Sequence, residues 1–334
     1  MANDAHALLT IEHLTHRYNA RTPRPVLSDI TLEIGVDDIM ALVGESGCGK
    51  TTLGKIVAGL VRPTEGSVQF HDKDIFSLRG SEYDRYRRSV QFIHQDPYAS
   101  LNPALTIEET LSAGLKRYRL VTGKRATRDR VEELIRTVGL SYDEDFLRRY
   151  PHQLSGGQRQ RIGVARAMAL NPQLIVADEA VSMLDVSVRV AILNLLLELK
   201  ETRKMSYLFI THDFGVVRHF AAGYRIGVLY YGKLVEVGLC EDIIQSPRHP
   251  YTYSLLSAVP VPDPHWNQNR PMIAIKSEDE INERTNGCPY AQRCTMAVDR
   301  CSEEEPPLMA VNDGHATACF LADQIPALGR EATV

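Results

Sequence analysis

The sequence reads IMALV at residues 39–43, GESGCGKT at 44–51 and TLGKIVAGL at 52–60. The first segment is a continuous apolar run, which is typical of a strand buried on both faces. The last has helical spacing. The middle segment fits G-x-x-x-x-G-K-[ST], a loop whose backbone N–H groups can surround phosphate oxygens. This order of strand, glycine-rich loop and helix predicts a phosphate-binding site.

Two side chains at the end of this loop have roles that the motif predicts. Lys50 is expected to reach the β- and γ-phosphates of a nucleotide, and the Thr51 hydroxyl to coordinate Mg²⁺. A flexible glycine-rich turn is the alternative interpretation, but the flanking strand and helix are the context that supports a nucleotide site. The nucleotide-binding residues expected here are Gly44, Glu45, Ser46, Gly47, Cys48, Gly49, Lys50, Thr51 and Thr52.

Cys48 lies inside this loop, beside the expected helix N-terminus. Thiol pKa values fall in such a setting, so the sequence predicts a lowered pKa and sensitivity to oxidation or alkylation. The alternative is that Cys48 has no redox role and is only a small residue that fits the loop. We favour this alternative for the protein in the cell. In either case alkylation of Cys48 is expected to block nucleotide binding.

A second buried strand is predicted at 174–178, LIVAD, and it ends at an acidic pair. Asp178 in this position can hold Mg²⁺ through water, and the adjacent Glu179 can polarise an attacking water as general base. Most Asp-Glu pairs are solvated surface, but that explanation fails directly after an apolar strand, because unpaired charge is not buried. The pair therefore points to nucleotide hydrolysis, with Lys50 and Glu179 as catalytic residues.

Further segments extend the pattern of strands and helices. Short strands are expected at 8–18 and 26–34, and a third buried strand, YLFIT, at 207–211. Between about 100 and 170 the chain is helical and highly charged. Because helical stretches precede the buried strands, we expect an α/β fold with a mostly parallel sheet and helices on its faces.

Composition narrows the class of protein. Lys plus Arg number 38 against 42 for Asp plus Glu, a net charge of −4, so the basic excess of a nucleic-acid-binding protein is missing. We expect no nucleic-acid partner. The chain has neither a run of about 20 apolar residues nor a signal peptide, so a cytoplasmic location is expected.

The segment LSGGQRQR at 154–161 resembles the signature motif of ABC ATPases and stands some 20 residues before the acidic strand, as it does in that family. Ser155 and the amides of Gly156 and Gly157 open a helix whose positive end can face a γ-phosphate. A plain helix cap is the alternative if the motif is taken alone.

The other motifs of an ABC ATPase occur in order. Tyr18 lies where the family has an aromatic that stacks on adenine, and Gln95 matches the glutamine that senses Mg²⁺ and the membrane subunits. Asp185 matches the D-loop that crosses the dimer interface, and His212 matches the catalytic histidine that contacts the γ-phosphate. The resemblance covers residues 8–265.

The resemblance implies a head-to-tail pair of ATPase subunits, with each ATP held between one P-loop and the other's signature motif. Two residues depart from the family pattern: Ala180 replaces a usual Pro, and Met183 a common Ala. Because Glu179 and His212 are retained, hydrolysis is still expected. The signature residues that would act on the partner's ATP are Ser155, Gly156, Gly157 and Gln158, and the Mg²⁺ ligands would be Thr51, Gln95 and Asp178.

QDPYASLNP at 95–103 and HPYTYSLLSAVPVPDP at 249–264 resemble the ATPases of bacterial dipeptide, oligopeptide and nickel importers. This implies peptide uptake, with nickel or oligosaccharide import as alternatives. The implied partners are a second, different ATPase subunit, two integral membrane permeases and an extracytoplasmic solute-binding protein. The chain would be peripheral, on the cytoplasmic face of the cell membrane. A soluble ABC protein acting on ribosomes or in DNA repair is a further alternative, but no basic patch or long insertion supports it.

Four cysteines crowd into the last fifth of the chain in the pattern C-x5-C-x6-C-x17-C. Zinc sites usually have C-x2–4-C knuckles, and disulfides are disfavoured in reducing cytoplasm. Iron–sulfur ligand spacings vary more widely. Members of the peptide-importer branch with this tail bind a [4Fe–4S] cluster, which favours the cluster over zinc or neither. Its expected ligands are Cys288, Cys294, Cys301 and Cys319.

These expectations define the predicted architecture. Residues 1–240 should form an ABC-type P-loop NTPase domain of class α/β, with a RecA-like core and a helical subdomain at about 98–165. Residues 241–334 should form a strap and a small cysteine-rich regulatory extension at 266–334. ATP, Mg²⁺ and the [4Fe–4S] cluster are the expected cofactors.

Overall fold

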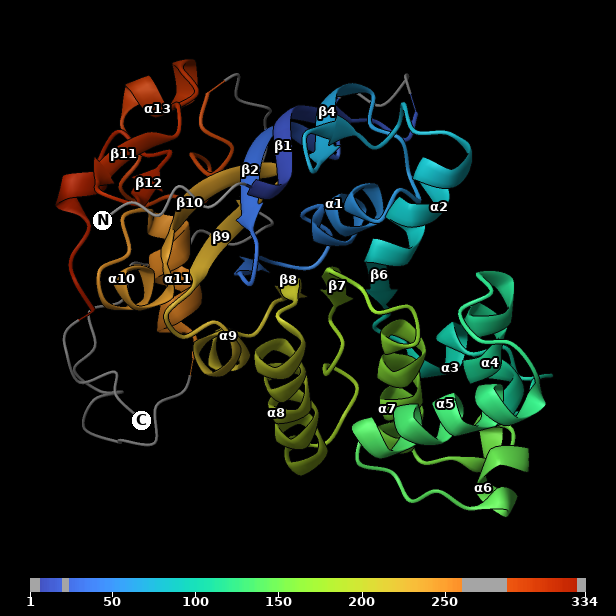
Figure 1. The fold of residues 1–334 in the computed structure, drawn as a ribbon. Coiled ribbons are helices and arrows are strands. Elements are labelled where there is room, and N and C mark those ends of the chain that lie inside the picture. Colours follow the sequence, from blue (N-terminus) through green and yellow to red (C-terminus); the bar gives the residue numbers. More distant parts are fainter. Residues whose placement is uncertain (1–6, 20–23, 260–286, 329–334) are drawn as a thin grey trace.

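The computed structural model describes residues 7–19, 24–259 and 287–328. The Pro-rich linker and the first part of the predicted extension lie outside them. Two sheets enclose the helix that follows the phosphate loop, and a separate group of helices lies to one side (Figure 1). Among the described helices, none is long and apolar enough to cross a membrane.

The smaller sheet has the strand order β2-β1-β4-β5 and is antiparallel. Its strands β1 and β2 match the two short strands predicted near the N-terminus, and buried residues alternate with exposed ones along β2 because only one face is covered. The strands are β1 (Ala7–His16), β2 (Leu27–Gly35), β4 (Glu65–Phe70) and β5 (Lys73–Asp74).

The larger sheet has the order β11-β12-β10-β9-β3-β8-β7-β6. Its five strands from β9 to β6 pair in parallel, and β10, β12 and β11 add antiparallel pairs at one end. All residues of β3, β7 and β8 are buried, as their apolar runs predict. The strands are β3 (Ile39–Val43), β6 (Val90–Ile93), β7 (Leu174–Asp178), β8 (Ser206–Thr211), β9 (Arg225–Tyr230), β10 (Lys233–Leu239), β11 (Met309–Asn312) and β12 (His315–Thr317).

Helix α1 (Lys50–Val57) lies between the two sheets (Figure 1). Its Leu53, Ile56 and Val57 are buried in one cluster with residues of both sheets. A Cβ on Gly54 would lie 2.8 Å from Ile210, so a glycine lets the helix approach the sheet. This close packing fixes the loop before α1 at the carboxyl ends of the parallel strands, where α/β proteins bind ligands.

The other described helices pack against the large sheet or against one another. The predicted helical region at 98–165 corresponds to the stretch from α3 to α7 (Figure 1). The helices are α2 (Gly80–Ser89), α3 (Pro97–Ser100), α4 (Ile107–Arg117), α5 (Lys124–Thr137), α6 (Glu144–Arg148), α7 (Gly156–Met168), α8 (Val186–Arg203), α9 (Phe214–Phe220), α10 (Cys240–Gln245), α11 (Pro250–Ser257) and α13 (Asp299–Glu303).

The C-terminal segment is joined to the core at β10. Glu236 is fully buried there, and its carboxylate accepts hydrogen bonds from the backbone N–H groups of Arg248 and His249 and pairs with His315 at 2.8 Å. Strand β12, which carries His315, pairs directly with β10. The extension predicted from residue 241 onward therefore continues the core sheet.

Candidate nucleotide-hydrolysing site

The phosphate loop connects β3 to α1 in a conformation that depends on glycine. Gly44, Gly47 and Gly49 all have positive φ, and a Cβ at Gly44 would lie 2.2 Å from the Leu229 carbonyl oxygen. No side chain fits at that distance. The loop therefore turns tightly against β9, with α1 beginning at Lys50.

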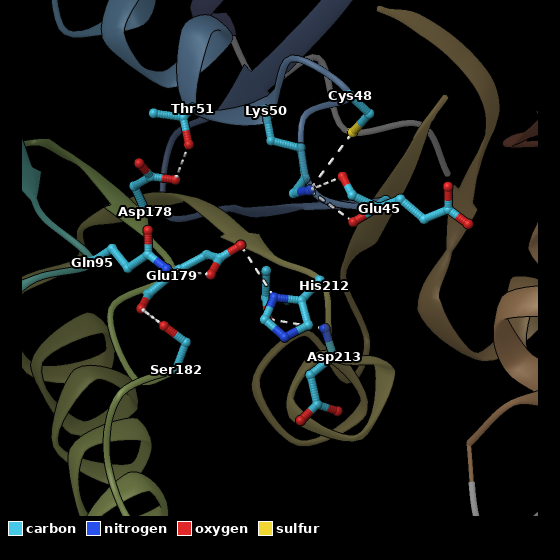
Figure 2. Close-up of polar contacts among 12 residues, drawn as sticks. Glu45, Cys48, Lys50, Thr51, Gln95, Asp178, Glu179, Ser182, His212 and Asp213 are labelled. Atoms are coloured by element: carbon cyan, nitrogen blue, oxygen red, sulfur yellow. Dashed lines mark hydrogen bonds and ion pairs between the residues drawn. The ribbon is translucent and has the colours of Figure 1, made fainter. Parts of the chain in front are cut away.

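Lys50 is buried beneath this loop. Its Nζ donates hydrogen bonds to the backbone carbonyl oxygens of Gly44 and Glu45, both at 2.7 Å. The ammonium is thus held by the same loop that surrounds the expected phosphate position (Figure 2). A phosphate anion offers stronger, charge-assisted hydrogen bonds than these carbonyls.

Thr51 and Asp178 are in contact at the N-terminal end of α1. The Thr51 hydroxyl donates to Asp178 Oδ1 at 3.0 Å. Burial raises the pKa of Asp178; the Thr51 hydrogen bond lowers it, and the neighbouring Glu179 adds to the increase. One carboxylate and one hydroxyl oxygen are the hard ligands that Mg²⁺ takes together with phosphate oxygens, so these residues fit the predicted ion.

Glu179 is held from both sides. Its Oε2 accepts a hydrogen bond from Gln95 Nε2 at 2.9 Å, and its Oε1 lies 3.1 Å from His212 Nδ1. Figure 2 shows its carboxylate between these two side chains. The backbone at Glu179 has φ 46, a left-handed conformation that costs free energy in a non-glycine residue and clusters at functional sites. No sequence pattern around Glu179 predicts this strained conformation.

Most of these residues line one cavity of about 600 Å³, whereas Asp178 is not on its wall. Val26 and Leu255 also line it, and the sequence did not indicate either. Leu255 comes from α11 in the predicted strap, so the strap contributes to this cavity. The predicted residues on its wall are Gly44, Glu45, Ser46, Gly47, Gly49, Lys50, Thr51, Thr52, Gln95, Glu179 and His212.

Tyr18 lies beside this cavity but does not line it. Its ring is 60% exposed, and its hydroxyl is 3.2 Å from the Thr52 Oγ1. The exposed face leaves room for a planar base to stack on the ring.

The signature and D-loop residues lie together, apart from the cavity. Ser155 caps α7 by accepting from the Gln158 N–H, while Gln158 Oε1 accepts from the Ser155 N–H, a capping box. Asp185 caps the neighbouring α8. A Cβ on Gly157 would lie 2.7 Å from Val188, so the two helix starts are in close contact. None of the residues from 155 to 158 lines the cavity.

The expectation of a lowered Cys48 pKa is wrong. The thiol is 6% exposed, and burial raises its pKa more than the nearby Lys50 lowers it. The Cys48 Sγ lies 3.6 Å from Lys50 Nζ. Cys48 does not line the cavity. A helix N-terminus lowers a thiol pKa, but at Cys48 the removal of the thiol from water raises the pKa by more.

Alkylation of Cys48 by iodoacetamide should therefore be slow at pH 7.5 and should accelerate about tenfold per pH unit, because only the thiolate reacts and its raised pKa lies above this range. Once modified, the loop cannot close over Cys48, and ATP binding should be lost. Site-resolved mass spectrometry combined with fluorescent ATP binding tests both statements. Full ATP binding after stoichiometric modification would contradict the second.

The four C-terminal cysteines come together. Cys288, Cys294, Cys301 and Cys319 line one cavity of about 20 Å³, room for about one water. Burial, with smaller contributions from the neighbouring thiols, raises the pKa of Cys288 to about 11 and that of Cys319 to about 12. Within the described ranges, no three His, Cys, Asp or Glu residues are arranged to hold a metal ion.

A glycine-rich loop, a buried lysine and a paired carboxylate in one cavity define a P-loop nucleotide-hydrolysing protein. Residues 27–182 match the model of the ABC transporter family, and residues 235–301 match the C-terminal region of oligopeptide/dipeptide transporters. The chain belongs to the ABC transporter ATP-binding subunits of the oligopeptide and dipeptide importer family. The predicted resemblance to the ATPases of peptide importers is confirmed, and the chain is an ATPase subunit of an ABC importer.

Known proteins match over most of the chain. It is 41% identical over 318 residues to YkfD of Bacillus subtilis, named as an oligopeptide transport ATP-binding protein, covering 94% of this chain and 95% of that protein. It is 43% identical over 284 residues to the oligopeptide transport protein OppF of the same species, covering 84% and 90%. The ATP-binding cassette MJ0796, solved as a dimer with ADP and Pi, has TM-score 0.62 and 31% identity, covering 70% and 98%.

Proposed function

We propose that this chain hydrolyses Mg·ATP with Glu179 as general base, and that this drives uptake of di- and oligopeptides. The observation that carries the catalytic part is the carboxylate of Glu179, held between Gln95 and His212 on the wall of the phosphate-loop cavity. Support for the peptide cargo comes from the names of its relatives.

The residues of the cavity divide the work. When ATP binds, Lys50 would donate its hydrogen bonds to β- and γ-phosphate oxygens instead of to the carbonyl oxygens of Gly44 and Glu45. Its positive charge would then stabilise the negative charge that develops on the reacting phosphate. Glu179 takes a proton from the attacking water, and Gln95 and His212 keep its carboxylate in place. His212 then contacts the γ-phosphate. Thr51, Gln95 and Asp178 would hold Mg²⁺, which neutralises phosphate charge when bound.

A second ATPase subunit completes the site in this proposal. Ser155 and the helix start at Gly156 lie outside this chain's own cavity, which supports a role for them at the ATP of a partner. Backbone N–H groups at the start of α7 and its positive dipole end favour a γ-phosphate there. We propose a different chain as partner, and a peripheral position on the cytoplasmic face of the membrane.

The experiment is to reconstitute the ATPase pair with two permease subunits in vesicles and add the solute-binding protein. We expect ATP hydrolysis to rise when the binding protein carries a peptide. Stimulation by nickel- or oligosaccharide-loaded binding protein instead would replace the peptide cargo by the alternative. Copurification of the native chain with ribosomes and not with permeases would contradict the transport role.

We also propose that Cys288, Cys294, Cys301 and Cys319 bind a [4Fe–4S] cluster. The convergence of four thiols on one cavity supports this, because thiolates are the ligands of such clusters. The small cavity has to widen around the cluster. A bound cluster would cross-link the C-terminal segment by iron–thiolate bonds, and a tetrahedral zinc ion is the competing occupant.

Anaerobic purification of the full chain should yield about four iron and four sulfide per chain, with broad visible absorbance, under this proposal. Replacing Cys301 by Ser should reduce the iron content and bleach the colour. The matched control is Cys240→Ser, a buried cysteine outside this group, which should leave iron unchanged. A colourless, zinc-loaded protein would contradict the cluster.

A further inference from the structure

The C-terminal segment reaches the phosphate loop through one ion pair. Arg293 Nη1 lies 2.8 Å from Glu45 Oε2, and Arg293 Nη2 lies 3.2 Å from Glu45 Oε1. Two parallel N–H···O bonds between a guanidinium and a carboxylate form the strongest and most directional type of ion pair. The residues are 248 positions apart in sequence, so the contact exists only because the C-terminal segment folds back on the core.

Glu45 is the residue through which this contact can act on the site. Its backbone N–H donates to the Tyr251 hydroxyl at 2.8 Å, and its carbonyl oxygen accepts from Lys50. Its carboxylate points away from Lys50 (Figure 2). The Glu45 side chain is thus held by Arg293 of the C-terminal segment. The backbone of the same residue belongs to the phosphate loop and orients Lys50.

Arg293 itself is held in a rigid setting. It lies in a turn closed by hydrogen bonds from the N–H groups of Ala291, Arg293 and Cys294 to carbonyl oxygens at 288 and 290. The same turn carries two of the clustered cysteines, and Cys288 N–H donates to the Cys301 carbonyl. Tyr290 packs against the rings of Tyr230 and Tyr251. The conformation of the cysteine-bearing turn therefore sets the position of the guanidinium.

We propose that Arg293 is a positioning residue for ATP binding, which links the cysteine-bearing turn to the phosphate loop. The proposal rests on the proposed nucleotide site. An exposed ion pair would contribute little to the stability of the loop. The Arg293 side chain, however, is only 11% exposed and makes both hydrogen bonds to one carboxylate. Any change that moves residues 288–294 shifts Glu45 and with it the carbonyl that holds Lys50.

Replacing Arg293 by Ala should raise the KM for ATP of the assembled transporter about five- to tenfold, with kcat within about twofold, because the loop loses order before ATP binds while the reacting groups stay. Direct binding of a fluorescent ATP analogue to the full chain should weaken by the same factor. Arg293→Lys should restore part of the affinity, since it keeps the charge but not the paired bonds.

The matched control is Arg300→Ala. Arg300 lies next to Cys301 as Arg293 lies next to Cys294, but it pairs with Glu304, away from the phosphate loop. We expect wild-type ATP affinity in this variant. Wild-type affinity in Arg293→Ala as well would overturn the proposal, whereas failure of the wild type itself to bind ATP would contradict the nucleotide site.

A double-mutant cycle separates positioning from general damage. In a Glu45→Gln background, Arg293→Ala should add no further loss of ATP affinity, because its partner charge is already gone. Full additivity would overturn the proposal. If Arg293→Ala does not fold, the single Glu45→Gln and Arg293→Lys variants carry the test, and unchanged ATP affinity in both would contradict it.

Coupling between two sites is reciprocal, which gives a measurement independent of activity. ATP should slow amide hydrogen exchange at residues 288–294 in the wild type and leave it unchanged in Arg293→Ala. Equal protection of the turn by ATP in both proteins would overturn the role of Arg293 as the link.

Discussion

Replacing Glu179 by Gln is expected to reduce ATP turnover of the assembled transporter by about 10²–10⁴-fold, the usual contribution of a positioned general base. Glutamine keeps the shape and can still contact Gln95 and His212, but it cannot take a proton from water. ATP should therefore remain bound. The measurement is phosphate release in single turnover, together with retention of labelled ATP on the purified complex.

Glu198→Gln is the matched control for this variant. Glu198 is exposed on α8 and lies outside the cavity, so the same chemical change there should leave turnover unaltered. Unchanged turnover in Glu179→Gln would remove Glu179 from the role of base. A loss of ATP binding instead of turnover would assign it to binding.

Replacing Lys50 by Ala should weaken ATP binding by about 100-fold or more, because a charge-assisted contact to two phosphates is removed and each such hydrogen bond contributes about 1.5–3 kcal/mol. The two carbonyl oxygens at Gly44 and Glu45 also lose their buried donor. Equilibrium binding of a fluorescent ATP analogue to the full chain measures the loss.

Lys116→Ala serves as its control, since Lys116 is an exposed residue in the last turn of α4. A melting temperature close to that of the wild type would show that the Lys50 variant is folded. The two largest predictions also differ from each other: Glu179→Gln should trap ATP, and Lys50→Ala should fail to bind it. Tight ATP binding in folded Lys50→Ala would contradict the proposed phosphate contact.

The sequence predicted correctly those parts of the site that are formed by consecutive residues. The loop at 44–51 and the helix start at 155–158 are each shaped by their own glycines and caps, so their local patterns predict their local structures. The buried strands β3 and β7 follow from unbroken apolar runs. Members of a family keep such segments in the same order, which is why the family could be identified before the fold was seen.

Features that depend on distant parts of the chain were missed. Leu255 reaches the cavity only through the packing of α11, and the Glu45–Arg293 pair requires the C-terminal segment to return. The error at Cys48 has the same origin, because its pKa is set by how deeply the loop is buried, not by its place before α1. Burial is a property of the whole fold and is not encoded in a short window of sequence.

The antiparallel pairing of β12 with β10 has a consequence during synthesis. Until residues 315–317 leave the ribosome, β10 is the last strand of the sheet and presents unpaired N–H and C=O groups along one side. Such an open edge invites pairing with other chains. Strand β12 therefore covers this edge of β10, and a chain without β12 would be exposed to misassembly even with its ATP site intact.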